Sequence, residues 1–122
     1  MYELVITDHF SSAHFLREYR GACENLHGHT WKVELAIASD QLDTVGLVID
    51  FKELKARLKQ LTDRWDHVCL NDLPEFQQMN PSTENMARWL YEEMGRSLPP
   101  EIRVRYVRVW ESETASVKYS EE

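Results

Sequence analysis

Apolar and polar residues alternate along both ends of the chain, and this pattern predicts β-strands there. In residues 1–14 one face of the expected strand carries Tyr2, Leu4, Ile6 and Phe10. The second strand is the clearest, with a single face made of His27, His29, Trp31, Val33, Leu35 and Ile37. Because strand side chains point to alternate faces, this strand is expected to be half buried. Residues 102–110 and 115–120 predict two further strands, and a slip in the alternation at Tyr106–Val107 indicates a bulge or a change of face.

The middle of the chain has apolar residues at every third or fourth position, which predicts two amphipathic helices. The first is expected at residues 51–65, with Asp50 as the N-cap and Glu53 completing a capping box. Its expected buried stripe is Phe51, Leu54, Leu58, Leu61 and Trp65. The second is expected to begin after a Ser82 cap, to end at Pro99–Pro100 and to bury Met86, Leu90 and Met94.

Two strands, two helices and two strands indicate an α+β fold, with a four-stranded antiparallel sheet and the two helices inserted between strands 2 and 3. A chain of 122 residues fits one domain, residues 1–122, around a single core. Both helices are expected on one face of the sheet. The other face then needs cover, so we expect the chain to form an oligomer.

Charge and composition exclude several classes of function. The formal net charge is −7, with 14 Lys+Arg against 21 Asp+Glu, which is unfavourable for binding nucleic acid. No run of 18 apolar residues predicts a membrane span, and the N-terminus lacks the features of a signal peptide. We therefore expect a cytosolic protein in which Cys23 and Cys69 are free thiols, with Cys69 in the core.

Histidines provide the candidate metal site. His27 and His29 are separated by one residue on a strand, so both side chains share a face about 7 Å apart. Since strands 1 and 2 are expected to pair, His14 at the end of strand 1 is the natural third ligand. Three histidine ligands and one open coordination position are typical of a catalytic zinc site. The simpler alternative is that His27 and His29 only line the apolar face of the strand and bind no metal. His9 has the opposite parity to His14 and is expected at the surface or beside the site.

Four other residues are candidates for chemistry. Cys23, four residues before His27, could be a fourth ligand, a thiolate base or an inert loop residue. Asp66 and His67 are an acid–imidazole pair that suits a proton shuttle, although neighbours in sequence often point apart. Glu111 is either an exposed acid in a turn or a carboxylate that accepts two parallel N–H bonds from a guanidine-like heterocycle.

Six motifs in order resemble the 6-pyruvoyl/6-carboxytetrahydropterin synthase family across nearly the whole chain. They are Phe10-Ser11-Ser12-Ala13-His14, Cys23-x-x-x-His27-Gly28-His29, Asp50-Phe51-x-x-Leu54-Lys55, Asp66-His67-x-x-Leu70-Asn71, Asn80-Pro81-Ser82-Thr83-Glu84-Asn85 and Val109-Trp110-Glu111. The resemblance implies the tunnelling fold, in which trimers close a twelve-stranded barrel and two trimers stack as a hexamer.

The resemblance also implies a site and a reaction. It implies Zn²⁺ at His14, His27 and His29, with Cys23 as proton acceptor and Asp66–His67 as proton relay. Glu111 would anchor the pterin ring and could join the relay, and the substrate class would be 7,8-dihydroneopterin triphosphate.

The short gap between Cys23 and His27 resembles the bacterial carboxy branch of the family, which serves queuosine synthesis. That branch releases acetaldehyde and triphosphate and leaves 6-carboxy-5,6,7,8-tetrahydropterin. Phe15, Trp65 and Ser82–Thr83 depart from the usual family residues. Candidate triphosphate ligands are Arg17, Arg20, Lys32 and the arginines of residues 102–110.

Three alternatives to the carboxy branch remain open at this stage. The pyruvoyl branch would eliminate triphosphate and keep the side chain. A non-catalytic zinc- or pterin-binding oligomer would use the same scaffold without turnover. A metal-free thiol hydrolase would use Cys23, His67 and Asp66, and would stay active after chelation.

Overall fold

A four-stranded antiparallel sheet and two helices form the architecture of the computed structural model, which describes residues 1–18 and 25–121. The strands are β1 (Tyr2–His14), β2 (His27–Ser39), β3 (Arg103–Ser112) and β4 (Ala115–Tyr119), and they lie side by side in chain order. The helices are α1 (Phe51–Thr62) and α2 (Thr83–Ser97). Three single 3₁₀ turns lie between them, η2 (Asp63–Trp65), η3 (Leu70–Asp72) and η4 (Pro74–Phe76). The predicted α+β order is therefore confirmed.

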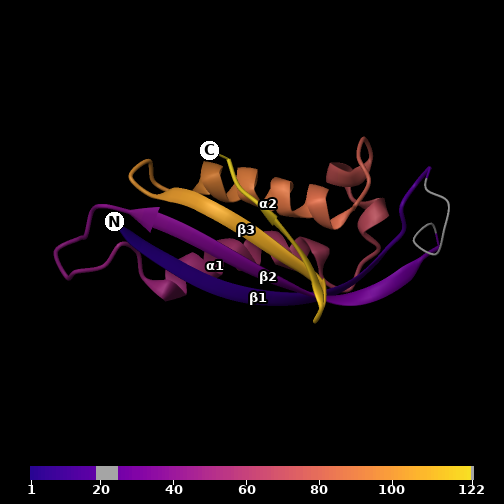
Figure 1. Ribbon diagram of the computed structural model, residues 1–122, viewed down its shortest axis with the longest axis horizontal. Coiled ribbons are helices and arrows are strands. Elements are labelled where there is room, and N and C mark those ends of the chain that lie inside the picture. Colours follow the sequence, from indigo (N-terminus) through magenta and orange to yellow (C-terminus); the bar gives the residue numbers. More distant parts are fainter. Residues whose placement is uncertain (19–24, 122) are drawn as a thin grey trace.

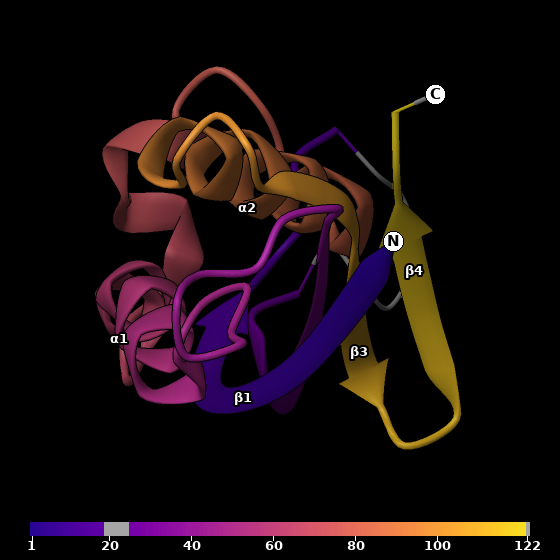
Figure 2. The ribbon, with the colours of Figure 1, turned by 90° about the vertical axis from the view of Figure 1, so that its left-hand side faces the viewer.

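Both helices cover the same face of the sheet and leave the other face open (Figure 2). α1 packs on β1, while α2 packs on β3 and β4. The core between the layers includes three large side chains without solvent exposure, Trp31, Trp65 and Phe76. At one end β1 and β2 extend past the helices (Figure 1), which places the start of β2 and the end of β1 beside the edge of the core.

The pairing of β1 with β2 brings the histidines together. These strands pair without a register shift from Tyr2–Ser39 to His14–His27. His14 and His27 are therefore direct cross-strand partners, and His29 lies two residues further on the same face of β2. The predicted third ligand thus follows from the register of one hairpin.

Two bulges interrupt β3. Between β2 and β3 the pairing skips Arg105, one residue before the predicted slip at Tyr106–Val107. Between β3 and β4 the register shifts between Trp110 and Ser112. Glu111 is thus the extra residue of the second bulge, and bulges commonly redirect a side chain.

Several details of the predicted helices and strands were wrong. α1 ends at Thr62, and residues 63–65 form a 3₁₀ turn instead of a last helical turn. Asp50 caps α1 by accepting from the Lys52 N–H, but the Glu53 carboxylate pairs with Arg57. Phe51, expected in the buried stripe, is 53% exposed. The Ser82 cap of α2 and its buried residues Met86, Leu90 and Met94 are as predicted.

Candidate metal centre

Four side chains converge at the end of the sheet where β1 ends and β2 begins. One ligand atom from each of His14, His27, His29 and Glu111 lies within 4.8 Å of the others. The Nε2 atoms of His14 and His27 are 3.0 Å apart, and His29 Nε2 is 3.2 Å from Glu111 Oε1. The wall behind them is the indole of Trp31, whose ring centroid lies 4.9 Å from that of His14 and 5.1 Å from that of His29.

Backbone carbonyls orient two of the imidazoles. His14 Nδ1 lies 2.7 Å from the Pro81 carbonyl oxygen, and His27 Nδ1 lies 2.7 Å from the Asn25 carbonyl oxygen. A carbonyl only accepts, so each Nδ1 carries the proton and each neutral ring presents an Nε2 lone pair. Two lone pairs facing each other at 3.0 Å repel unless a cation lies between them. The arrangement therefore fits a metal ion.

Burial and the remaining donors support the same conclusion. Burial lowers the pKa of His14 and that of His29, and in both cases this outweighs the opposing effect of the Glu111 carboxylate. His29 Nε2 is buried and makes no hydrogen bond with the residues that the structure describes. Neutral imidazoles with one carboxylate form a donor set that zinc prefers. These four side chains can thus hold the metal that the sequence predicts, with Glu111 added to the three histidines.

Loop residues to which the sequence analysis gave no structural role fix the end of β1. The Asn71 side chain accepts from the Phe15 N–H and donates to the Phe15 carbonyl, and Asn80 makes the same pair of bonds with Arg17. The Arg17 guanidinium donates to three backbone carbonyls, those of Phe76, Met79 and Asn71. Arg17 is therefore committed to holding this loop rather than free to bind phosphate.

Thr83 is a further residue to which the sequence analysis assigned no contact. Its hydroxyl donates to Glu111 Oε2 over 2.9 Å and joins the first turn of α2 to the bulge of β3. Together with the Pro81 carbonyl, it brings the segment before α2 into the site. The motif around Asn80-Pro81-Ser82-Thr83 carried this signal, although its members could not be assigned contacts without the fold.

Asp66 and His67 form the expected pair but lie outside the cluster. Asp66 Oδ2 is 2.9 Å from His67 Nδ1, and the bond from the Ser11 N–H, followed by that from His67, lowers the pKa of Asp66. The His67 N–H donates to the Ser11 carbonyl, so the pair lies along the outer edge of β1. His67 has a φ of 58° and an 82% exposed side chain. A left-handed conformation in a residue other than glycine is strained, and such strain is concentrated at functional sites.

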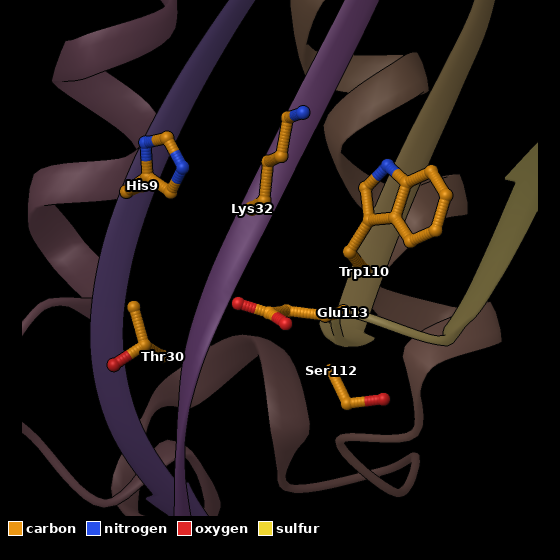
Figure 3. Close-up of a pocket in the computed structure, with 6 residues that line it drawn as sticks. All are labelled: His9, Thr30, Lys32, Trp110, Ser112 and Glu113. Atoms are coloured by element: carbon orange, nitrogen blue, oxygen red, sulfur yellow. The ribbon is translucent and has the colours of Figure 1, made fainter.

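The remaining candidates fall elsewhere. Cys23 and Arg20 lie outside the described residues, and Cys69 is only partly buried, which corrects its expected place in the core. On the open face of the sheet a hollow of about 400 Å³ is lined by His9, Thr30, Lys32, Trp110, Ser112 and Glu113 (Figure 3). His9 and Lys32 thus project from the face opposite to the cluster. Neither α-helix of the described chain has the length and apolarity that crossing a membrane requires.

Comparisons with known proteins identify relatives of the chain in sequence and in fold. The family model described as 6-pyruvoyl tetrahydropterin synthase matches residues 3–122. A 6-carboxy-5,6,7,8-tetrahydropterin synthase of Bacillus subtilis is 40% identical over 96 residues, covering 75% of the chain and 64% of that relative. The chain thus spans less than two thirds of that relative's length.

Two further matches extend the comparison. A dihydroneopterin monophosphate aldolase of Pyrococcus furiosus is 32% identical over 95 residues, covering 78% of each chain. Among solved structures, the 6-pyruvoyl tetrahydropterin synthase of Caenorhabditis elegans superposes with a TM-score of 0.85 at 24% identity, covering 99% of the chain and 96% of that structure. At this identity the superposition establishes the fold alone.

Proposed function

Because the chain belongs to the 6-pyruvoyl tetrahydropterin synthase family, we propose that it is a zinc-dependent lyase acting on 7,8-dihydroneopterin triphosphate. The products are 6-carboxy-5,6,7,8-tetrahydropterin, acetaldehyde and triphosphate, a step of queuosine synthesis. The observation that carries the proposal is the convergence of His14, His27 and His29 with Glu111. The bacterial relative with the carboxy name favours this branch over the pyruvoyl branch.

His14, His27 and His29 hold Zn²⁺ in this proposal. When bound, Zn²⁺ supplies Lewis acidity, which acidifies the hydroxyl groups of a substrate side chain beside it. The Trp31 wall and the carbonyl bonds to His14 and His27 keep the imidazoles in place. Glu111 accepts N–H bonds from the guanidine-like edge of the pterin, since a carboxylate matches two parallel donors.

Cys23 accepts a proton from the substrate, and His67 returns one from an imidazole that Asp66 orients. The 2.9 Å contact of His67 Nδ1 with Asp66 supports this role, because a carboxylate stabilises the protonated ring. Within one chain the pair lies at the β1 edge, outside the cluster. The relay therefore needs a second copy of the chain.

Closing sheets into a ring would supply that copy. Strand directions alternate across β1, β2, β3 and β4, so the next β1 in a ring would run antiparallel to β4. The end of that β1 would then lie at the same end of the sheet as the start of β4, close to Glu111. This arrangement brings Asp66–His67 of one copy toward the cluster of the next.

The decisive experiment incubates zinc-loaded protein with dihydroneopterin triphosphate and identifies the products by mass. Carboxytetrahydropterin with acetaldehyde is expected, and pyruvoyltetrahydropterin without acetaldehyde would assign the chain to the other branch. A protein that binds the pterin without converting it would be a non-catalytic binder. Full turnover after chelation would support the metal-free thiol hydrolase and contradict the proposal.

The shared site has its own test. Chains with Cys23→Ala and chains with His67→Ala are each expected to be inactive. After unfolding and refolding together, mixed oligomers should regain activity, because some sites receive both intact residues. Mixtures that stay inactive would place all catalytic residues of a site in one chain.

A further inference from the structure

Three cationic side chains lie together on the open face of the sheet, on the side away from the histidine cluster. Lys32 on β2 is the cross-strand partner of Trp110 on β3. Arg108, two residues before Trp110 on the same face of β3, is the partner of Lys118 on β4. Directly opposed residues have Cβ atoms about 4.5–5.5 Å apart, and diagonal neighbours are about 7–8 Å apart. The three side chains therefore form one row across three neighbouring strands.

Aromatic rings, rather than carboxylates, hold these cations. The Lys32 ammonium and the Arg108 guanidinium lie 5.9 and 5.8 Å from the centroid of the Trp110 ring. The Lys118 ammonium lies 4.6 Å from the centroid of the Tyr106 ring. None of the three cations makes an ion pair within residues 1–18 and 25–121. Their charges are therefore available to a ligand.

The arrangement of charge on this face is unfavourable without such a ligand. Arg108 and Lys118 oppose each other directly, and like charges at such positions destabilise a sheet. The Glu34 carboxylate, which lies opposite Arg108, accepts the Tyr106 hydroxyl bond over 2.6 Å. The whole chain has a net charge of −7, so acids to neutralise these cations are abundant in the sequence. A negatively charged ligand would relieve the repulsion within the row.

A hollow of about 400 Å³ adjoins the row and gives a ligand room (Figure 3). Lys32 and Trp110 line it from neighbouring strands, and Thr30 and Ser112 add hydroxyl groups. The volume is typical of a site for a small molecule. Glu113, in the turn between β3 and β4, is the acid of this lining.

We propose that this face binds a linear oligophosphate, with Lys32, Arg108 and Lys118 contacting its phosphoryl groups. Several negative charges along one short chain can neutralise all three cations, whereas a single orthophosphate reaches fewer of them. Arg108 offers a planar fork of donors and the two lysines offer compact charges, and both kinds of group bind phosphate oxygens. Because the row and the histidine cluster are on opposite faces, this site does not depend on turnover at the cluster.

Calorimetric titration of the zinc-loaded protein with inorganic triphosphate tests the site. Lys32→Gln, Arg108→Gln and Lys118→Gln are each expected to weaken binding about tenfold, because each removes a bond to a charged ligand. Glu113→Gln should strengthen binding, since it removes a negative charge from the lining of the hollow. Lys52→Gln is the matched control, because this exposed lysine belongs to the helical layer on the other face. Orthophosphate should bind at least about tenfold more weakly than triphosphate.

Two further arms identify the ligand and its place. Adenosine triphosphate that binds more tightly than inorganic triphosphate would assign the site to a nucleotide with its base beside Trp110, and the reverse order would assign it to the free chain. His29→Ala, which disables the metal site, should keep the affinity for triphosphate.

Absence of triphosphate binding, loss of binding in His29→Ala, or equal affinity in all three cation variants and the unaltered protein would overturn the site. Equal affinities for orthophosphate and triphosphate would also overturn it. None of these outcomes bears on whether the cluster converts a pterin, so the proposed function is tested separately.

Discussion

Backbone carbonyls set the chemistry of individual side chains in this site. The Pro81 and Asn25 carbonyls hold the protons of His14 and His27 on Nδ1, so both Nε2 atoms are available as ligands. Support of this kind fixes the tautomer and the ring orientation of metal ligands. The candidate metal site thus depends on the backbone of two loops as well as on the strands that carry the histidines.

Metal binding should depend on the histidines of one face only. His27→Ala and His29→Ala are each expected to lower zinc affinity by at least tenfold, because each removes a ligand. His9→Ala is the control, since His9 is exposed on the other face of the sheet. The measurement is zinc per chain after dialysis against a weak chelator, and equal zinc in all three variants would contradict the site.

Sequence alone predicted the histidines but not the residues that hold them. Parity along a strand places His27 and His29 on one face, and the hairpin register adds His14. The bonds of Thr83 to Glu111 and of Asn71 to Phe15 join residues that are 28 and 56 positions apart. The spacing of residues along one helix or strand cannot predict such distant contacts, so they are known only from the folded structure.

Among the short elements, η4 anchors η2 through one buried carboxylate. Glu75 has a side chain only 5% exposed and accepts bonds from Arg64 and from the indole N–H of the fully buried Trp65. Burial alone would raise the pKa of Glu75, but the bonds from Arg64 and Trp65 outweigh it, and the pKa is lowered. This link positions the segment that leads into Asp66–His67.

Removing that carboxylate should destabilise the fold. Glu75→Ala leaves the Trp65 N–H without its partner and is expected to lower the free energy of unfolding by about 2–3 kcal/mol in urea. Since the folded-state pKa of Glu75 is depressed, its contribution is present above the ordinary carboxyl pKa and is lost as the pH falls through the folded value. Glu53→Ala, at an exposed pair with Arg57, should cost about 0.5 kcal/mol or less. Similar losses for the two variants would contradict this interpretation.

Between β2 and β3, the Tyr106 hydroxyl donates to Glu34 Oε2 over 2.6 Å. This bond, followed by burial, raises the pKa of Tyr106 to about 12. Its stabilising contribution should therefore be complete below the ordinary tyrosine pKa of about 10 and disappear as the pH rises toward 12. The bond to Glu121 also raises the pKa of Tyr119, so tyrosinate absorbance should be followed in variants. Glu34→Gln should shift the titration of Tyr106 to lower pH, and Tyr106→Phe should remove the component near pH 12.

The helices and strands were predictable where apolar residues recur at a regular spacing, but the residues at which they end were not. The alternation of apolar and polar residues located β2, and the Ser82 cap followed by a stripe of buried apolar residues located α2. The change from α1 to η2 depends on packing, since Trp65 enters the core from a 3₁₀ turn and Phe51 stays outside. Likewise the bulge at Arg105 was foreseen from a lost alternation, but its position one residue earlier is set by pairing with β2.

At the scale of the whole molecule, the open face and the two sheet edges are the features that remain to be covered. β1 and β4 each have one neighbour among the described strands, and residues 66–69 cover the β1 edge only near Ser11 and Ala13. Unpaired strand edges are templates for pairing with another chain. The edges therefore support the ring of copies that the proposed relay requires.

A single proline can separate pairing between copies from pairing within the sheet. The N–H groups of Ser11 and Ala13 point outward from the β1 edge, toward Asp66 and Val68. In a regular antiparallel pair of strands, the N–H groups of alternate residues point to the same side. The Val5 N–H therefore also points outward from the β1 edge. Val5→Pro should thus remove a bond to a neighbouring copy while leaving the β1–β2 ladder intact.

We expect Val5→Pro to shift the protein to smaller species in sedimentation velocity and to lose turnover, while each chain still binds zinc. Val5→Ala keeps the N–H and removes similar apolar surface, so it should retain both assembly and activity. A Val5→Pro protein that stays assembled would exclude this edge from the interface. A fully active monomer would instead show that His67 serves the cluster of its own chain, because only an oligomer can bring the β1 edge of one copy to the Glu111 of another.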